Sequence, residues 1–243
     1  MKQLHLALLL VFILGFSSVK LSAQDHFLKV KLLYEDNFDS VNLTDWILEL
    51  QDEASIVEVK NGKLDINVPK GSTIWFKQKL KGNILIEYDA IVIDQNGPND
   101  RVSDLNCFWM ATDARNRKDI FNSPRKPSGM FHDYDTLQLY YVGMGGHNNT
   151  KTRFRRYDGK GGKPLLPEHD LIGDKVLLEA NKSYKIKLIA MGNTVQFFRD
   201  DELIYDFKDE NPYKKGWFGF RTINNHMSVD NFKVYRIKKP KSK

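Results

Sequence analysis

The chain has 243 residues, of which 41% are hydrophobic and 28% are charged. This composition is typical of globular proteins and excludes the collagen-like, coiled-coil and intrinsically disordered classes. The single cysteine, Cys107, excludes an intramolecular disulfide bond and a cysteine-based zinc site. A chain of this length can bury a sizeable core without such cross-links.

The formal net charge of +6 is concentrated at the two ends of the chain. Six lysines account for it: Lys2, Lys20, Lys238, Lys239, Lys241 and Lys243. The body between them is neutral overall, which argues against nucleic acid as the main partner. We interpret residues 237–243 as a solvated basic tail.

The first 23 residues are typical of an export signal. A basic start at Met1-Lys2 precedes an apolar run from Leu6 to Phe16 and the small residues Ser22-Ala23. The apolar run is shorter than the roughly 20 residues that a membrane-spanning helix needs. We therefore expect cleavage near Gln24, a periplasmic or secreted protein, and no membrane contact after cleavage. The alternative is an uncleaved anchor.

Short strand-forming runs, separated by Gly, Asn, Asp and Pro, dominate the rest of the chain. We expect strands at 56–59, 63–68, 72–77, 84–93, 105–111, 136–142, 152–157, 183–191, 194–199, 202–207, 216–222 and 228–235. The pairs Asn61-Gly62, Gly192-Asn193 and Asp200-Asp201 predict tight hairpin turns. Short helices are expected only around Leu43–Trp46 and Ala114–Phe121.

Strands without intervening helices predict antiparallel sheets, packed as a sandwich or a barrel. No repeat, low-complexity tract or long linker divides the chain, so we expect residues 24–243 to form a single domain. Long loops are predicted at 122–135, 143–151 and 158–171, and loops of this length are usually functional.

Three motifs carry a resemblance to known proteins: Tyr34–Asp39, Gly216–Thr222 and Val229–Val234. Their combination resembles the concanavalin A-like lectin/glucanase superfamily. The resemblance implies an all-β fold, a jelly-roll β-sandwich of two antiparallel sheets whose first and last strands lie side by side. Four further stretches resemble an uncharacterised exported family of bacterial polysaccharide-utilisation loci, and distantly the YesU-like proteins associated with rhamnogalacturonan breakdown: 104–111, 152–157, 165–170 and 218–227.

Strand alternation identifies a candidate sugar platform in Gly216–Thr222. Phe218 and Phe220 share the face that suits the core, which leaves Trp217 and Arg221 on the other face. An indole can stack on a pyranose, and a guanidinium can bind a carboxylate with two hydrogen bonds. The alternative is rim packing for Trp217 and an ion pair for Arg221.

A cationic strip is predicted on the strand 152–157, where Arg153 and Arg155 share a face. Such a strip suits an anionic polymer, for example a uronate or a sulfated glycan. An edge strand protected from aggregation by its charges is the alternative. Trp109 and Gln138 complete the candidate substrate-binding residues.

Candidate catalytic residues are the histidines His132, His169 and His226 and the tyrosine Tyr140. An imidazole with a pKa near ~6.5 can accept a proton at neutral pH, and a tyrosine can donate one. A structural or surface role is the alternative for each histidine.

Paired carboxylates offer a second kind of chemistry. Glu87 and Asp89 share a strand face about 6.6 Å apart, within the range of roughly 5 to 9.5 Å that glycosidase carboxyls need. The laminarinase-like branch of the superfamily carries Glu-x-Asp-x-x-Glu, and Val92 replaces the last acid here. Structural acids are the alternative interpretation.

Asp36, Asp39 and Asp230 are candidate ligands of a structural calcium ion, which some superfamily members hold near the paired end strands. Calcium prefers carboxylate and carbonyl oxygens. Asx turns and strand-end caps are the alternative. No other cofactor is expected.

The first functional hypothesis is a polysaccharide lyase that cleaves an anionic polysaccharide by β-elimination at a uronate. This reaction needs a cation to neutralise the carboxylate, a base to remove a proton and an acid to protonate the leaving oxygen. Arginine, glutamine, histidine and tyrosine form a similar constellation in jelly-roll alginate lyases, whose sequence motifs are absent here. The alternatives are a non-catalytic glycan-binding module and a glycoside hydrolase that uses Glu87 and Asp89.

The expected partner is a polysaccharide or oligosaccharide, bound by a monomer. Five side chains are predicted to line one groove, joined by Tyr140 and by His132 or His169: Arg153, Arg155, Trp217, Arg221 and His226.

Overall fold

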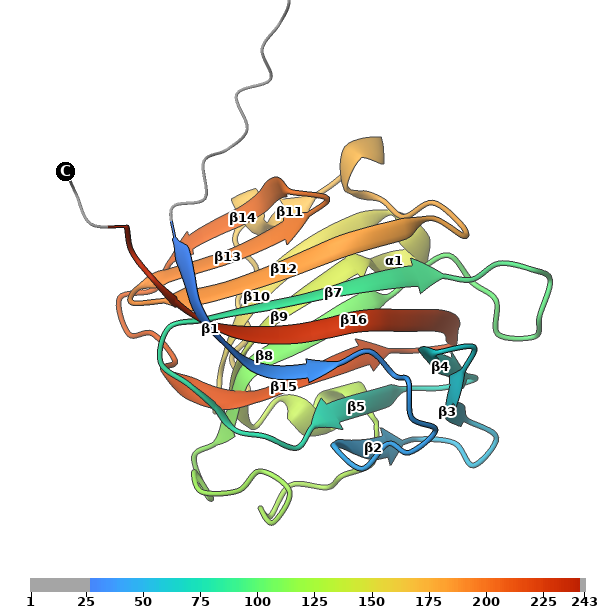
Figure 1. Ribbon diagram of the computed structural model, residues 1–243, viewed down its shortest axis with the longest axis horizontal. Coiled ribbons are helices and arrows are strands. Elements are labelled where there is room, and N and C mark those ends of the chain that lie inside the picture. Colours follow the sequence, from blue (N-terminus) through green and yellow to red (C-terminus); the bar gives the residue numbers. More distant parts are fainter. Residues whose placement is uncertain (1–26, 241–243) are drawn as a thin grey trace, which may run out of the picture.

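The computed structural model describes residues 27–240, which form two packed layers of antiparallel strands (Figure 1). Strands account for 53% of the residues and helices for 7%, which confirms the predicted all-β class. The expected export signal, residues 1–23, lies outside the described part of the chain. Within residues 27–240, no helix is long and apolar enough to cross a membrane.

Sheet A has eight strands. Its spatial order is β14 (Glu202–Lys208), β13 (Thr194–Arg199), β12 (Ser183–Met191), β7 (Ile84–Val92), β16 (Asn225–Lys238), β4 (Lys63–Val68) and β3 (Ile56–Lys60), and β1 (Leu28–Asp36) pairs with β16. Tyr34 lies opposite Val234, and Asp36 lies opposite Phe232. The predicted pairing of the first and last strands is therefore confirmed.

Sheet B also has eight strands. Its order is β11 (Asp170–Leu171), β10 (Lys151–Asp158), β9 (Leu137–Gly145), β8 (Leu105–Asp113), β15 (Lys215–Thr222), β5 (Ser72–Phe76) and β2 (Trp46–Leu50), and β6 (Leu80–Lys81) pairs with β15. The helical turns are α1 (Gly146–Asn149) and the 3₁₀ turns η1 (Phe131–Tyr134), η2 (Pro167–His169) and η3 (Asp174–Val176).

The three predicted hairpin turns join β3 to β4, β12 to β13 and β13 to β14, as expected. The two predicted helices do not form. Residues 43–46 lead through a turn into β2, and residues 114–121 form successive turns. In the second segment, the side chains of Asp113, Asn116 and Asp119 accept hydrogen bonds from backbone N–H groups two residues ahead. Such bonds compete with the helical ladder and favour turns.

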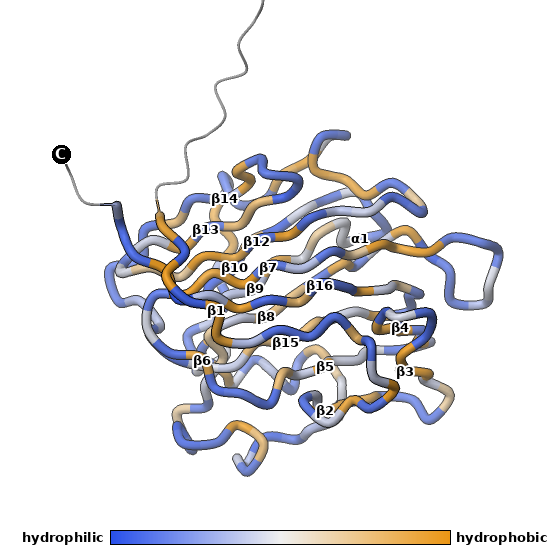
Figure 2. The backbone as a smooth tube through the Cα atoms, in the orientation of Figure 1, coloured by the Kyte–Doolittle hydropathy of each residue, from blue (hydrophilic) through white to orange (hydrophobic). Residues whose placement is uncertain are grey.

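The core between the sheets is rich in aromatic side chains. The ring of Trp46 lies 5.2 Å from that of Phe220 and 5.1 Å from that of Phe232. Phe218 and Phe220 face this core, as the alternation of their strand predicts. Figure 2 shows that hydrophobic residues concentrate along the strands, whereas the long loop after β7 is hydrophilic.

Part of the outer face of sheet B is covered by the loop of residues 114–136, hereafter the covering loop. Beneath it lies a second apolar cluster that includes Trp75, Phe108 and Trp217 from the sheet and Tyr134 from the loop. The covering loop is fastened by a buried ion pair between Arg125 and Glu49 of β2, in which Arg125 Nη1 donates to Glu49 Oε2 at 2.8 Å. The Tyr134 hydroxyl donates to the same oxygen at 2.8 Å.

We predict that Arg125→Ala destabilises the protein by about 3 to 5 kcal/mol, because Glu49 then remains buried without its partner. Chemical denaturation measures this change. Arg117→Ala removes an exposed arginine of the same loop and is the control, with an expected effect within about 0.5 kcal/mol. Equal stability of the two variants would show that the ion pair does not hold the covering loop.

Candidate functional site

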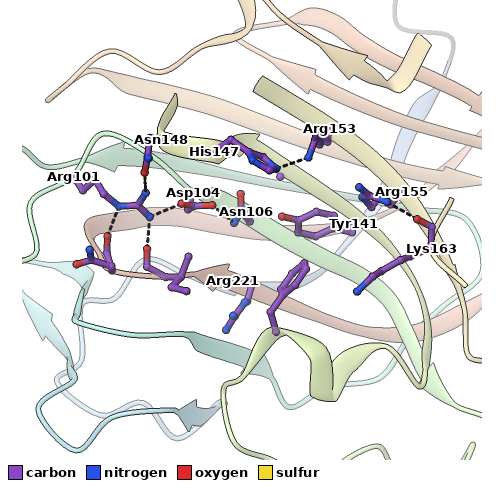
Figure 3. A pocket seen from close by; sticks show the side chains of 15 residues that line it. Arg101, Asp104, Asn106, Tyr141, His147, Asn148, Arg153, Arg155, Lys163 and Arg221 are labelled. Carbon is purple, nitrogen blue, oxygen red and sulfur yellow. Dashed lines mark hydrogen bonds and ion pairs between the residues drawn. The ribbon is translucent and has the colours of Figure 1, made fainter. Parts of the chain in front are cut away.

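A cavity of about 530 Å³ opens where the covering loop leaves the outer face of sheet B bare (Figure 3). Its floor is formed by outward-facing residues of β8, β9, β10 and β15. Its rim is formed by α1, by Phe131 of η1, by Lys163 and by the turn at residues 223–224.

The floor consists of two rows of cross-strand neighbours. The first row is Arg221, Asn106, Gly143 and Arg153, and the second is Gly219, Phe108, Tyr141 and Arg155. Directly opposed residues of neighbouring antiparallel strands have Cβ atoms about 4.5 to 5.5 Å apart. The polar groups of both rows therefore form one continuous patch.

A glycine in the first row determines the position of Tyr141. A Cβ atom at Gly143 would lie 2.4 Å from the Tyr141 hydroxyl oxygen, so any side chain there would displace the ring. The hydroxyl therefore lies over Gly143, in the row between Asn106 and Arg153. Burial raises the pKa of Tyr141, and the nearby Arg221 and Arg155 oppose this shift. The hydroxyl is accordingly protonated at neutral pH.

Positive charge dominates the cavity lining. The cationic lining residues are Arg101, Arg153, Arg155, Lys163 and Arg221, whereas Asp104 is the single acid in the lining. Three of the cations have carboxylate partners. Arg101 pairs with Asp104, Arg153 Nε contacts Asp170 at 2.7 Å, and Lys163 contacts Asp135 at 2.7 Å. Arg153 also lowers the pKa of Asp170.

Arg155 and Arg221 have no acidic partner among residues 27–240. Arg155 donates to the carbonyl of Lys163 at 2.5 Å, and Arg221 donates to the carbonyl of Gly129 at 2.5 Å. Arg221 is only 1% exposed, and burial lowers its pKa. A buried cation without a paired carboxylate is unfavourable, so an anion bound beside Arg221 would stabilise it.

The rim contains a strained turn. His147, Asn148 and Asn149 have positive φ angles of 54°, 56° and 58°, a left-handed conformation that asparagine tolerates but that costs about 1 to 2 kcal/mol at His147. Asn149 is held by two hydrogen bonds to the backbone of Leu178, both 2.8 Å, and Asn148 accepts one from Arg101 at 2.7 Å. Strain of this kind persists where the surroundings enforce it, frequently at functional sites.

The strained turn places His147 beside Arg153. Nη1 of Arg153 contacts Nε2 of His147. Because a guanidinium can only donate hydrogen bonds, Nε2 of His147 is the acceptor in this contact.

Three predicted binding residues meet at the cavity: Arg153, Arg155 and Arg221. Their strand faces follow the alternation expected from the sequence. Trp217 shares this face but is 4% exposed in the apolar cluster, where its indole donates to the carbonyl of Lys77. Gln138 lies outside the cavity lining, near the backbone of Asp158.

Tyr140 and Trp109 point into the core, so their expected place in the groove is wrong. Their rings are 5.5 Å apart, and the Tyr140 hydroxyl donates to Asp209 at 2.6 Å. The cause is the covering loop. It makes the outer face of sheet B apolar as well, so the face of Leu139 and Tyr141 resembles a core face in the sequence.

The expected histidines do not line the cavity either. His132 is exposed beside Asp133, at 3.2 Å. His169 packs its ring against Phe154, 4.9 Å away. His226 belongs to β16 of sheet A. The predicted grouping of His226 with Arg221 is therefore wrong, because the two residues lie on strands of different sheets.

Glu87 and Asp89 lie on β7 of sheet A, away from the cavity. Glu87 accepts from Lys29 at 2.8 Å, and Asp89 accepts from Asn231 at 2.8 Å. Both carboxylates therefore have structural partners.

The described residues contain no group of three or more His, Cys, Asp or Glu side chains that could hold a metal ion. Asp36 instead accepts hydrogen bonds from the Phe38 backbone and the Trp46 indole, both at 2.8 Å. Asp36, Asp39 and Asp230 therefore form no such group within residues 27–240, and a structural calcium ion near them stays a prediction.

The sequence predictions did not include most of the lining residues, among them Asn106, Tyr141, Gly143 and His147. The run Gly145-Gly146-His147-Asn148-Asn149 was a usable signal, since glycine and asparagine favour left-handed turns. No local sequence pattern predicts the strand register that places Asn106 beside Arg221.

Comparison with known proteins gives one family. Residues 66–232 match the model described as "Domain of unknown function (DUF6250)". No curated protein sequence matches the chain.

Solved structures show a similar fold. A Bacillus subtilis protein of unknown function with a galectin-like fold has a TM-score of 0.70 and 19% identity, over 88% of this chain and 100% of that chain. An endo-β-1,3-glucanase from Pyrococcus furiosus has a TM-score of 0.60 and 10% identity, over 88% of this chain and 99% of that chain. The B. subtilis carbohydrate-binding module CBM66 has a TM-score of 0.52 and 16% identity, over 80% of this chain and 98% of that chain. These neighbours confirm the predicted concanavalin A-like β-sandwich of two antiparallel sheets.

The environment of His169 predicts a pH-dependent stability. Burial lowers its pKa below the ordinary value of 6.5, while Glu168 acts in the opposite direction. The unfolded chain therefore binds the proton more readily, so the contribution of neutral His169 is complete above about pH 6.5 and is lost as the pH falls below it. Denaturation at a series of pH values should show a smaller loss on acidification for His169→Phe than for the wild type.

An unchanged pH dependence of the unfolding free energy in His169→Phe would contradict the assignment of His169 to the core.

Proposed function

The chain belongs to the DUF6250 family, and we propose that it binds the acidic part of an anionic saccharide in the cavity on sheet B. The observation that carries this proposal is the pair Arg155 and Arg221, two lining cations without a carboxylate partner among the described residues. A guanidinium binds a carboxylate or a sulfate through parallel charge-assisted hydrogen bonds. A bound anion would give both arginines the counter-charge that the protein does not supply.

A saccharide is the class of anion that the rest of the lining suits. The cavity volume of about 530 Å³ lies within the range of small-molecule sites, roughly 300 to 1,000 Å³. The lining offers hydroxyl, amide and carboxylate groups for sugar hydroxyls, and the ring of Phe131 for an apolar sugar face. The structural neighbours that are named as a carbohydrate-binding module and a glucanase support the same class.

Export would bring this site to its ligand. The expected signal at residues 1–23 sends the chain to the periplasm or outside the cell, where polysaccharides are found.

Arg155 provides the cleanest test of anion binding. Hydrogen bonds to charged groups contribute about 1.5 to 3 kcal/mol, so Arg155→Ala should weaken binding of the preferred acidic oligosaccharide by roughly tenfold or more. Calorimetric titration of wild type and variant against oligouronates and sulfated oligosaccharides measures this loss. Arg117→Ala removes the same charge outside the cavity and should bind like the wild type.

Equal affinity of Arg155→Ala and wild type would overturn the proposal. Arg221→Ala is a poorer test, since Arg221 is 1% exposed and supports Gly129 of the covering loop. Its removal leaves a cavity and an unpaired carbonyl, so we expect a lower melting temperature as well as weaker binding.

A second candidate function is β-elimination, favoured by the position of the Tyr141 hydroxyl on the same floor as the two free arginines. Arg155 and Arg221 would neutralise a sugar carboxylate, which makes the adjacent ring proton acidic. His147 Nε2, once released from Arg153, would take that proton. The electron pair forms a carbon–carbon double bond, the glycosidic carbon–oxygen bond breaks, and protonated Tyr141 supplies the proton to the leaving oxygen.

Tyr141→Phe separates catalysis from binding. If the chain is a lyase, the wild type produces an unsaturated product that absorbs in the ultraviolet, and Tyr141→Phe loses this activity while it still retains the polysaccharide. Ultraviolet absorbance during incubation with uronate polymers measures the reaction. Retention of the polymer by the wild type without any gain in absorbance would identify a binding module instead.

A further inference from the structure

We infer that Asn106 accepts a hydrogen bond from a hydroxyl group next to the bound anion. The cavity would therefore bind a sugar acid more tightly than a simple oxyanion. This inference rests on the proposed anion-binding function and names its ligand more closely. The ligand class is a single sugar ring that carries both a negatively charged group and a free hydroxyl.

The amide oxygen of Asn106 lacks a protein donor. Asn106 is 4% exposed, and its Oδ1 is buried without a hydrogen-bond partner in the described part of the chain. Its Nδ2 donates to Asp104 Oδ1 at 3.2 Å. The opposite orientation of the amide would bring Oδ1 against the Asp104 carboxylate, so the orientation is fixed by this contact.

Asp104 is itself held in place. Its Oδ2 accepts from Ser103 Oγ at 2.7 Å and from Arg101 Nη2. Arg101 in turn donates to the carbonyls of Ile223 and Asn224 at 2.6 and 2.8 Å. Asp104, Arg101 and the rim therefore hold the Asn106 amide in this orientation, in which Oδ1 has no partner within the described residues.

The unused acceptor lies close to the anion site. Asn106 is the direct cross-strand neighbour of Arg221 and of Gly143, over which the Tyr141 hydroxyl lies. Cβ atoms of such neighbours are about 5 Å apart, a distance that substituents on one sugar ring can span. One ring can therefore present an acidic group to Arg221 and a hydroxyl to Asn106.

The nature of the acceptor favours hydroxyl-bearing ligands over simple anions. Carboxylates and sulfates are deprotonated at neutral pH and carry only acceptor oxygens, so they cannot satisfy Oδ1 of Asn106. Oδ1 is already unpaired in the free protein, so a simple anion leaves it unpaired, whereas a sugar hydroxyl supplies the missing donor. The preference for a hydroxyl-bearing ring should therefore be about tenfold in affinity.

The test compares ligands on the wild-type protein. Galacturonate, glucuronate, mannuronate and guluronate each carry a carboxylate and hydroxyls, whereas cyclohexanecarboxylate has the same charge and ring size without hydroxyls. We expect at least one hexuronate to bind about tenfold more tightly than cyclohexanecarboxylate. Galactose 6-sulfate against inorganic sulfate, measured in parallel, identifies whether the anion is a carboxylate or a sulfate ester, and a tenfold preference in either pair supports the inference.

Asn106→Leu then assigns the preference to this residue. The variant should remove most of the difference in affinity between the sugar acid and its hydroxyl-free counterpart. A melting curve reports whether the variant folds, and the ligand comparison on the wild type stands without it.

The failures are distinguishable. Equal affinity for the sugar acids and their hydroxyl-free counterparts overturns the inference but leaves anion binding intact. An equal loss of affinity for all ligands in a folded Asn106→Leu protein overturns the role of Asn106. No binding of any acidic sugar or oxyanion overturns the proposed function itself.

Discussion

Two arginines held at one cavity without a counter-charge are the feature on which the account depends. Arg221 is almost completely buried, and its guanidinium donates to the carbonyl of Gly129 and lies 5.4 Å from the ring of Phe131. Arg155 has one carbonyl partner on the neighbouring loop. Burial of a cation without a carboxylate is unfavourable for folding, so the rest of the structure must offset it. A bound anion would supply the missing counter-charge, and this electrostatic stabilisation would favour binding.

The surrounding structure fixes the cavity in position. The buried pair of Glu49 and Arg125 fastens the covering loop, which brings Phe131 and the carbonyl of Gly129 to Arg221. On the opposite rim, the left-handed turn at His147 is enforced by the hydrogen bonds of Asn149 and of Arg101. Both the buried charges and the strained turn cost stability, and the packed aromatic core between the sheets offsets that cost. These contacts therefore define the shape of the cavity.

Strand alternation was sufficient to predict the fold class and part of the site. It placed Arg153, Arg155 and Arg221 on outward faces, because charged side chains cannot enter a dry core. It failed for Tyr140, because the covering loop buries the outer face of sheet B as well. Both faces of β9 therefore carry apolar residues, and alternation does not distinguish the core face. It also failed for His226, whose strand belongs to the other sheet. Sheet membership and register depend on contacts between residues far apart in the sequence, and no local pattern encodes them.

The most direct test of the central claim is a crystal structure of the protein with an acidic oligosaccharide. The account predicts that the acidic group lies within hydrogen-bond distance of Arg155 and Arg221, with the sugar ring over Tyr141 and Asn106. An ordered sugar elsewhere, for example beside Glu87 and Asp89 on sheet A, would contradict it.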